Sequence, residues 1–184
     1  TVNDGWYEPE NTRLHLLRIQ PVSGVFRRRD RVQQHLPRLS DRFAVPRRDA
    51  EEHHWKRSIL LARHSPIESL MFRVELQGIP SWVSVHLVRH KIGVTHYVSS
   101  QRDDRHANPK PRAEMPQGTP INHTMVLNAQ AVIAISKKRL CSQASRETVA
   151  VWSGVEALMR ELDPAMAWAM NPECWWCGGL CPEM

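Results

Sequence analysis

The apolar residues in the first half of the chain follow two different periods. Residues 12–19 alternate imperfectly between polar and apolar side chains and predict a strand that ends near Pro21. Residues 70–76, most of them apolar, predict a second strand, which Gly78 and Pro80 end. The segments around these two strands have the longer period and the end signals of helices.

Two of these helices are predicted by their terminal residues. Residues 49–63 begin with acidic side chains and end with Arg63, which is the charge order that a helix dipole favours. Ser81 can cap a second helix, which continues through apolar positions to Arg89. Arg89 is also the first residue of a polar segment with several charged side chains, so we expect this second helix to end there.

The second half of the chain divides into three parts. Residues 92–117 are polar and contain three prolines, so they predict a loop for most of their length. Residues 124–161 contain no proline and one glycine, and predict one or two long helices. Residues 163–184 are rich in cysteine and tryptophan, and we interpret them as a tail on a main domain of residues 1–162.

Composition places the chain among ordinary globular proteins. It has 184 residues, of which 41% are hydrophobic and 24% charged, so it can bury the core of one domain. No apolar run is long enough to span a bilayer, and the first residues lack the pattern of a signal peptide. We therefore expect a cytoplasmic protein with no membrane partner.

The net charge of +6 is concentrated in one segment. Residues 22–48 contain eight arginines and two aspartates. Such a segment suits an anionic partner, and a nucleic acid is one candidate. A solvated arginine-rich loop accounts for the same charge equally well.

Candidate chemistry follows the second helix. Arg89, His90 and Lys91 stand at its end, and a hydroxyl-rich stretch with Ser99 and Arg102 comes next. Guanidinium groups bind phosphate through paired hydrogen bonds, and serine hydroxyls can complete such a site. The alternative is that the cations only satisfy the last carbonyls of the helix.

The order of these residues resembles a family signature. Arg89-His90-Lys91, seven residues and then Ser99 is similar to the RHR-x7-S motif of the flavin-dependent thymidylate synthases, the ThyX family. The stretch 64–68 (HSPIE) resembles the turn that precedes the motif in that family, and 128–141 resembles its NAR…LRLC helix. The resemblance extends from about residue 12 to residue 160. It implies an α+β fold with a small, mainly antiparallel sheet flanked by helices.

The resemblance also implies an activity. Members transfer a one-carbon unit from methylenetetrahydrofolate to C5 of dUMP, with FAD as the cofactor and NADPH as the reductant, so the chain is expected to be a methyltransferase that makes dTMP. Members of the family are homotetramers with shared active sites.

The chain departs from the family pattern in three residue types, those at Lys91, Gln130 and Ala134. This departure keeps a second hypothesis open, in which the same fold hydroxymethylates C5 or acts on another pyrimidine nucleotide. A third hypothesis is a non-catalytic protein that binds nucleic acid through residues 22–48.

Carried over by position, the resemblance implies two sets of site residues. The substrate-binding set is His86, Arg89, Ser99, Ser100, Arg102 and Arg139. The cofactor-binding set is His64, Ser65, Arg89, His90, Lys91 and Asn128. Arg139 is also the expected catalytic residue, because it would stabilise negative charge that develops on the uracil. Whether Ser99 or Ser100 is the motif serine stays open. On a continuous helix, Asn128, Arg139 and Arg146 would share one face.

The tail contains a possible metal site. Cys174, Cys177 and Cys181 have metal-like spacing, but three thiolates leave a tetrahedral zinc site one ligand short. Cys141 or a histidine could supply the fourth ligand. The alternative is an apolar flap in which Trp175 and Trp176 pack on the main domain and the cysteines are free.

Overall fold

A computed structural model describes residues 18–21, 49–99 and 111–182. The described elements, in chain order, are β1 (Arg18–Pro21), α3 (Asp49–Ala62), the 3-10 helix η2 (Ser65–Ser69), β2 (Met71–Pro80), α4 (Ser81–Val88), β3 (Val94–Val98), the 3-10 helix η4 (Arg112–Glu114), β4 (Pro120–Asn128), α5 (Ala129–Arg139), α6 (Arg146–Leu162), α7 (Pro164–Ala169) and α8 (Glu173–Trp176).

The described strands form one antiparallel sheet of four strands in the order β1-β2-β4-β3. The long strands β2 and β4 pair at its centre, with Val74 opposite Met125. The register shifts between Leu76 and Ile79, and the amide of Gly78 in this bulge donates a hydrogen bond to the side-chain oxygen of Asn122. Strands and helices both contribute to one core, so the fold is α+β, as expected.

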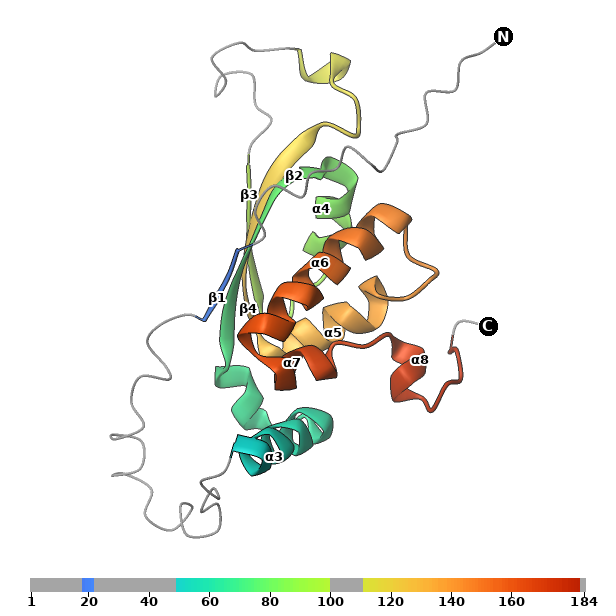
Figure 1. Cartoon of the computed structure of the whole chain (residues 1–184). Helices are drawn as coiled ribbons and strands as arrows, with labels where there is room; N and C mark the ends of the chain where they lie inside the picture. Colours follow the sequence, from blue (N-terminus) through green and yellow to red (C-terminus); the bar gives the residue numbers. More distant parts are fainter. Residues whose placement is uncertain (1–17, 22–48, 100–110, 183–184) are drawn as a thin grey trace.

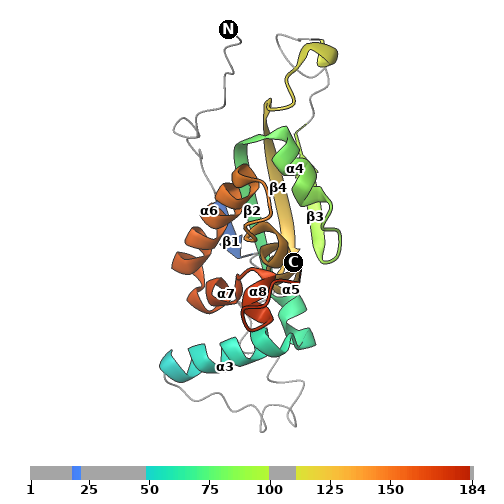
Figure 2. The ribbon, with the colours of Figure 1, turned by 90° about the vertical axis from the view of Figure 1, so that its right-hand side faces the viewer.

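The helices cover one face of the sheet (Figures 1 and 2). Alternate residues of β2 and β4 point into this layer, and Val74, Met125 and Leu127 are completely buried there. Trp152 and Val155 of α6 pack in the same core. Burial of these large apolar side chains supplies most of the driving force for folding.

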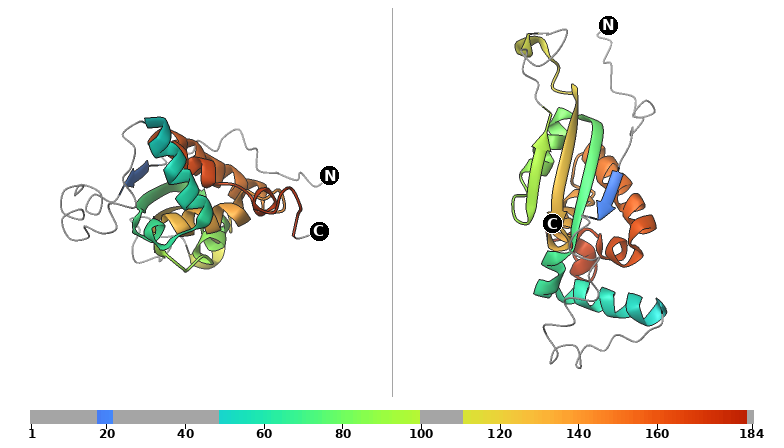
Figure 3. Two further views of the ribbon diagram at one scale, coloured as in Figure 1. Left: turned by 90° about the horizontal axis from the view of Figure 1, so that it is seen from below. Right: turned by 90° about the vertical axis from the view of Figure 1, so that its left-hand side faces the viewer.

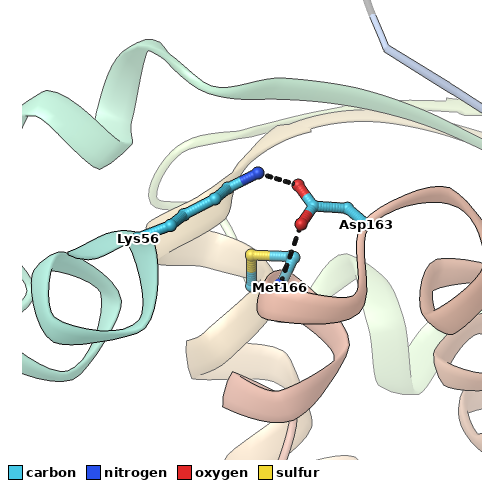
Figure 4. Close-up of polar contacts among 3 residues, drawn as sticks. All are labelled: Lys56, Asp163 and Met166. Carbon is cyan, nitrogen blue, oxygen red and sulfur yellow. Dashed lines mark hydrogen bonds and ion pairs between the residues drawn. The ribbon is translucent and has the colours of Figure 1, made fainter. Parts of the chain in front are cut away.

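Helices α3 and α7 extend the helical layer at one end of the molecule (Figures 1 and 3). Asp163 joins them, because one carboxylate oxygen pairs with Lys56 of α3 and the other accepts a hydrogen bond from the amide of Met166 (Figure 4). Asp163 thus caps α7 and links it to α3. Ala165 and Met166 belong to the main core, and the division of the chain at residue 162 stays a prediction.

Two predicted elements are wrong. Residues 124–128 are the end of strand β4 instead of the start of a helix, because apolar side chains alternate along 121–127 with a period of two. The predicted loop 92–117 contains strand β3, whose side chains are mostly exposed because it lies at the sheet edge. The first strand is present as β1, and residues 12–17 of its predicted range lie outside the described residues.

The predicted continuous stripe from Asn128 to Arg146 is also wrong. Helix α5 ends at Arg139, and α6 begins at Arg146 after Ser145, whose hydroxyl caps it by accepting from the amide of Thr148. Separately, no helix among the described residues is both long and apolar enough to cross a membrane.

Candidate functional site

Three segments meet at one end of the sheet. The amide of Asn128 at the end of β4 donates to the carbonyl of Gly93 before β3, at 3.0 Å. The next amide, of Ala129, donates to the carbonyl of Leu70 before β2, at 2.9 Å. The loop after α4, the start of α5 and the segment that follows η2 are therefore fixed next to one another.

Gly93 and Asn128 fit closely at this junction. Gly93 has a φ of 70°, in the left-handed region that glycine adopts readily. A Cβ atom at this position would lie 2.6 Å from the side-chain oxygen of Asn128. That oxygen accepts a hydrogen bond from the amide of Ala131 at 2.9 Å and so caps α5. Asn128, expected to bind the cofactor, thus has a capping role in the structure.

Arg139, at the end of α5, connects to the end of α4. Its Nε donates to Nε2 of His90 at 3.0 Å, and its Nη2 donates to the carbonyl of His86 at 2.7 Å. Burial and the neighbouring charge of Arg89 lower the pKa of Arg139, but an arginine still keeps its charge at neutral pH. Arg139 also lines a shallow surface pocket, whose other lining residues are Lys138, Cys141, Gln143 and Ala144.

The contact with Arg139 fixes the protonation of His90. Burial, Arg139 and His96 lower the pKa of His90 to about 4, so its ring is neutral at pH 7. Because a guanidinium only donates hydrogen bonds, Nε2 of the ring must accept, and the hydrogen must be on Nδ1. His90 therefore has one N–H group for a further acceptor.

His86 faces away from this contact, toward α6. Its Nδ1 lies 2.9 Å from Oγ1 of Thr148, which in turn lies 2.8 Å from Oγ of Ser145. Burial, Arg139 and Arg89 lower the pKa of His86. His86 therefore contacts Arg139 through its backbone carbonyl, whereas its ring contacts Thr148.

Arg89 and Lys91 provide exposed positive charge at the same place. Both side chains are exposed, and neither has a hydrogen-bond or ion-pair partner among the described residues. His64 and Ser65 are exposed at the start of η2, which packs against α5. The end of α4 thus combines two available cations, the fixed cation of Arg139 and the neutral ring of His90.

Ser99 lies at the opposite end of β3 from these residues. Its amide and hydroxyl bond to the backbone of Asn122, at 2.8 and 2.9 Å. An extended strand of the length of β3 spans about 17 Å. Within one chain, therefore, Ser99 and Lys91 cannot hold the same phosphate. Ser100, Arg102 and the arginine-rich segment 22–48 lie outside the described residues.

Two histidines beside the site belong to neither predicted set of site residues. His123 on β4 is completely buried, and its Nε2 lies 3.0 Å from Nδ1 of His96 on β3. Nε2 of His96 lies 2.7 Å from the carbonyl of His90. The alternation of β4 would have placed His123 on the buried face, but residues 124–161 were interpreted as helical.

The tail packs on the helix that carries Arg139. Lys137 of α5 pairs with Glu173 at 2.7 Å, and its ammonium lies 5.0 Å from the ring centre of Trp176. Trp176 packs against the core, whereas Trp175 is exposed. The four cysteines are free, and the described part of the chain contains no group of three or more His, Cys, Asp or Glu side chains placed to hold a metal.

No protein-family model and no curated protein sequence matches the chain. Among solved structures, it is similar to the UMP/dUMP methylase PolB from Streptomyces cacaoi, which was solved with 5-Br dUMP bound. The two share 14% identity and superpose with a TM-score of 0.56 over 84% of this chain and 94% of the other. At this identity the similarity shows a common fold.

Proposed function

We propose that this chain is an enzyme that transfers a one-carbon unit to C5 of a pyrimidine nucleotide, most simply from dUMP to dTMP, with FAD as its cofactor. The observation that carries the proposal is the contact between Arg139 and His90 beside the available cations Arg89 and Lys91. A nucleotide presents a phosphate and a carbonyl-rich base edge, and this group of side chains offers donors for both. The shared fold with a UMP/dUMP methylase supports the same substrate class.

Residues at both ends of α5 also fit a dinucleotide cofactor. The exposed cations Arg89 and Lys91 suit its phosphates, and Oε1 of Gln130 in the first turn of α5 is buried without a hydrogen-bond partner among the described residues. His64 and Ser65 would contact the cofactor from η2. When bound, FAD supplies hydride obtained from NADPH, and methylenetetrahydrofolate supplies the carbon.

The chain's own residues orient the nucleotide and stabilise charge. A new carbon–carbon bond at C5 replaces the C5–H bond, and the C5 proton is released. Negative charge on the pyrimidine develops before this bond forms, and Arg139 is the fixed cation that would stabilise it. The N–H group of His90 would hold a carbonyl or phosphate oxygen without changing its own charge near pH 7.

We further propose a homotetramer in which two chains complete each site. Ser99 was expected to bind the nucleotide and Lys91 the cofactor of the same active site, but β3 separates the two residues within one chain. This separation supports a site built from two chains. Ser99 of one chain would then act at the site formed by Arg89 and Arg139 of another.

The first test combines a spectrum with a product assay. Protein incubated with FAD and freed of excess cofactor should show flavin absorbance bands. With NADPH and methylenetetrahydrofolate, mass spectrometry should detect a methylated product from dUMP or UMP, or a hydroxymethylated product if the second hypothesis holds. Protein that binds neither FAD nor a pyrimidine nucleotide would refute the proposal. Arg139→Gln should lose product, whereas Arg73→Gln on the far face of the sheet should retain it.

Mixed oligomers test the shared site. Arg139→Gln and Ser99→Ala chains should each be inactive alone. Chains mixed during refolding should recover part of the activity, because some sites then receive a native Arg139 from one chain and a native Ser99 from another. No recovery in oligomers shown to contain both chains would contradict the shared arrangement.

A further inference from the structure

A line of hydrogen-bonded side chains extends from the core to the candidate site. Oγ of Ser84 on α4 lies 3.1 Å from Nδ1 of His123, and Nε2 of His123 lies 3.0 Å from Nδ1 of His96. Nε2 of His96 lies 2.7 Å from the carbonyl oxygen of His90. The line therefore joins α4, β4 and β3, and it ends on the residue that contacts Arg139.

The position of every hydrogen in this line follows from its last acceptor. The carbonyl of His90 only accepts, so Nε2 of His96 must donate to it. With one hydrogen on each ring, Nδ1 of His96 then accepts from Nε2–H of His123. His123 in turn accepts at Nδ1 from the hydroxyl of Ser84. All donors thus point the same way, toward His90.

Apolar packing does not explain why a histidine occupies position 123 at the buried end of the line. The other inward-facing residues of β4 near His123 are Ile121, Met125 and Leu127, which are all apolar. A polar ring among them is costly unless both nitrogens have partners, and here both do. Burial and His96 lower the pKa of His123 to about 4, which keeps the ring neutral as the line requires.

The last group also defines what the line can do. A backbone carbonyl cannot pass a proton onward, so the line does not conduct protons to the site. We propose instead that His123 and His96 are positioning residues: with Ser84, they hold the backbone of His90 so that its ring meets Arg139 and its N–H group faces the nucleotide. The nucleotide part of this inference rests on the proposed function.

Matched variants separate positioning from simple stability. His123→Leu removes both hydrogen bonds of the buried ring, whereas His123→Gln keeps an amide donor for His96 and an amide acceptor for Ser84. Ile121→Val is the control, because it creates a small cavity on the same face of β4 without touching the line. Two readouts are used for each folded variant: long-range proton–nitrogen NMR of the imidazoles at pH 7.5, and calorimetric titration with dUMP.

In the native protein, NMR should show hydrogen on Nδ1 of His90 and on Nε2 of His96. His123→Leu should shift the His90 nitrogen signals, mix the two neutral forms of His96 and weaken dUMP binding about tenfold. His123→Gln should restore both readouts to within about twofold, and Ile121→Val should change neither.

The outcomes keep the two proposals apart. If the native chain binds neither FAD nor any pyrimidine nucleotide, the proposed function fails, and the NMR signals of His90 and His96 still decide the positioning role. If His123→Leu leaves these signals and the affinity at native values, the positioning role is overturned. It is also overturned if His123→Gln, shown to be folded, behaves like His123→Leu.

Discussion

Nε of Arg139 donates to Nε2 of His90 over 3.0 Å, and the positive charge of Arg139 lowers the pKa of the ring that receives this hydrogen bond. The same contact fixes the ring's hydrogen on Nδ1. The charge of Arg139 and the position of the hydrogen on the His90 ring are thus coupled.

Removal of the Arg139 charge should raise the pKa of His90. In Arg139→Gln we expect a value above about 4 but below the ordinary 6.5, because burial still disfavours the charged ring. An NMR titration of the His90 ring measures the shift. Arg73→Gln removes the same charge from an exposed ion pair on the other face of the sheet, and should leave the pKa unchanged. An unchanged value in Arg139→Gln would contradict the coupling.

The free energy of unfolding should fall as the pH drops below about 6.5. His90 and His123 have folded-state pKa values of about 4, so the unfolded chain binds more protons between pH 6.5 and pH 4. Stability is therefore present above this window and decreases within it, by up to about 3 kcal/mol for the fully buried His123. Urea unfolding at pH 7.5, 5.5 and 4.5 measures the loss. His123→Gln should reduce the pH dependence, and an equally steep profile in that variant would exclude His123 as its source.

Gly93→Ala and Gly78→Ala form a matched pair. Both glycines have positive φ, but only at Gly93 would the new Cβ collide with the side chain of Asn128. We expect a loss of about 1 kcal/mol for Gly78→Ala from backbone strain alone. For Gly93→Ala we expect about 2–3 kcal/mol, because the cap of α5 is also lost. Chemical denaturation of both variants gives the comparison, and equal losses would show that Asn128 moves aside freely.

Glu173→Gln should destabilise the tail and the last turn of α5. It leaves the ammonium of Lys137, which is nearly buried, without its charged partner, at a cost of about 1–3 kcal/mol. Glu156→Gln breaks the exposed pair with Arg160 one turn away on α6, and should cost less than about 0.5 kcal/mol. Thermal unfolding of the two variants at pH 7 distinguishes them. Similar melting temperatures would mean that the tail is not held by Lys137.

The sequence predicts the helices of this fold better than its strands. Helices α3 and α4 agree with the predictions within about one residue, and acidic residues open α3 as predicted. Ser81, the predicted cap of α4, does not cap it: Pro80 occupies the N-cap position, and the hydroxyl of Ser81 donates to the carbonyl of Gln117. Strand β3 was missed because its edge position lets polar and exposed side chains occupy it. Strand β4 passes directly into α5 at Asn128 with no proline or glycine between them, so the break that separates the two periods is a single capping side chain.

The candidate site shows the same division. The motif singled out His90 and Arg139, and the structure joins these two residues although one precedes β3 and the other ends α5. The motif could not show that Ser99 lies at the far end of β3, since neighbours along an extended strand separate quickly in space. Nor could it show His123, whose partners come from α4 and β3 and depend on the sheet order.

The pairing of β2 with β4 also affects how the molecule forms. Strand β3 lies between them in sequence but at the sheet edge in space, so β3 gains its only neighbour in the described sheet after β4 has been synthesised. His90 and Arg139 are 49 residues apart along the chain. When two distant segments of a chain come together, conformational entropy is lost before their contacts form, and this loss slows folding. A nascent chain that stops before α5 can therefore contain the whole Arg89-His90-Lys91 segment and still have no site.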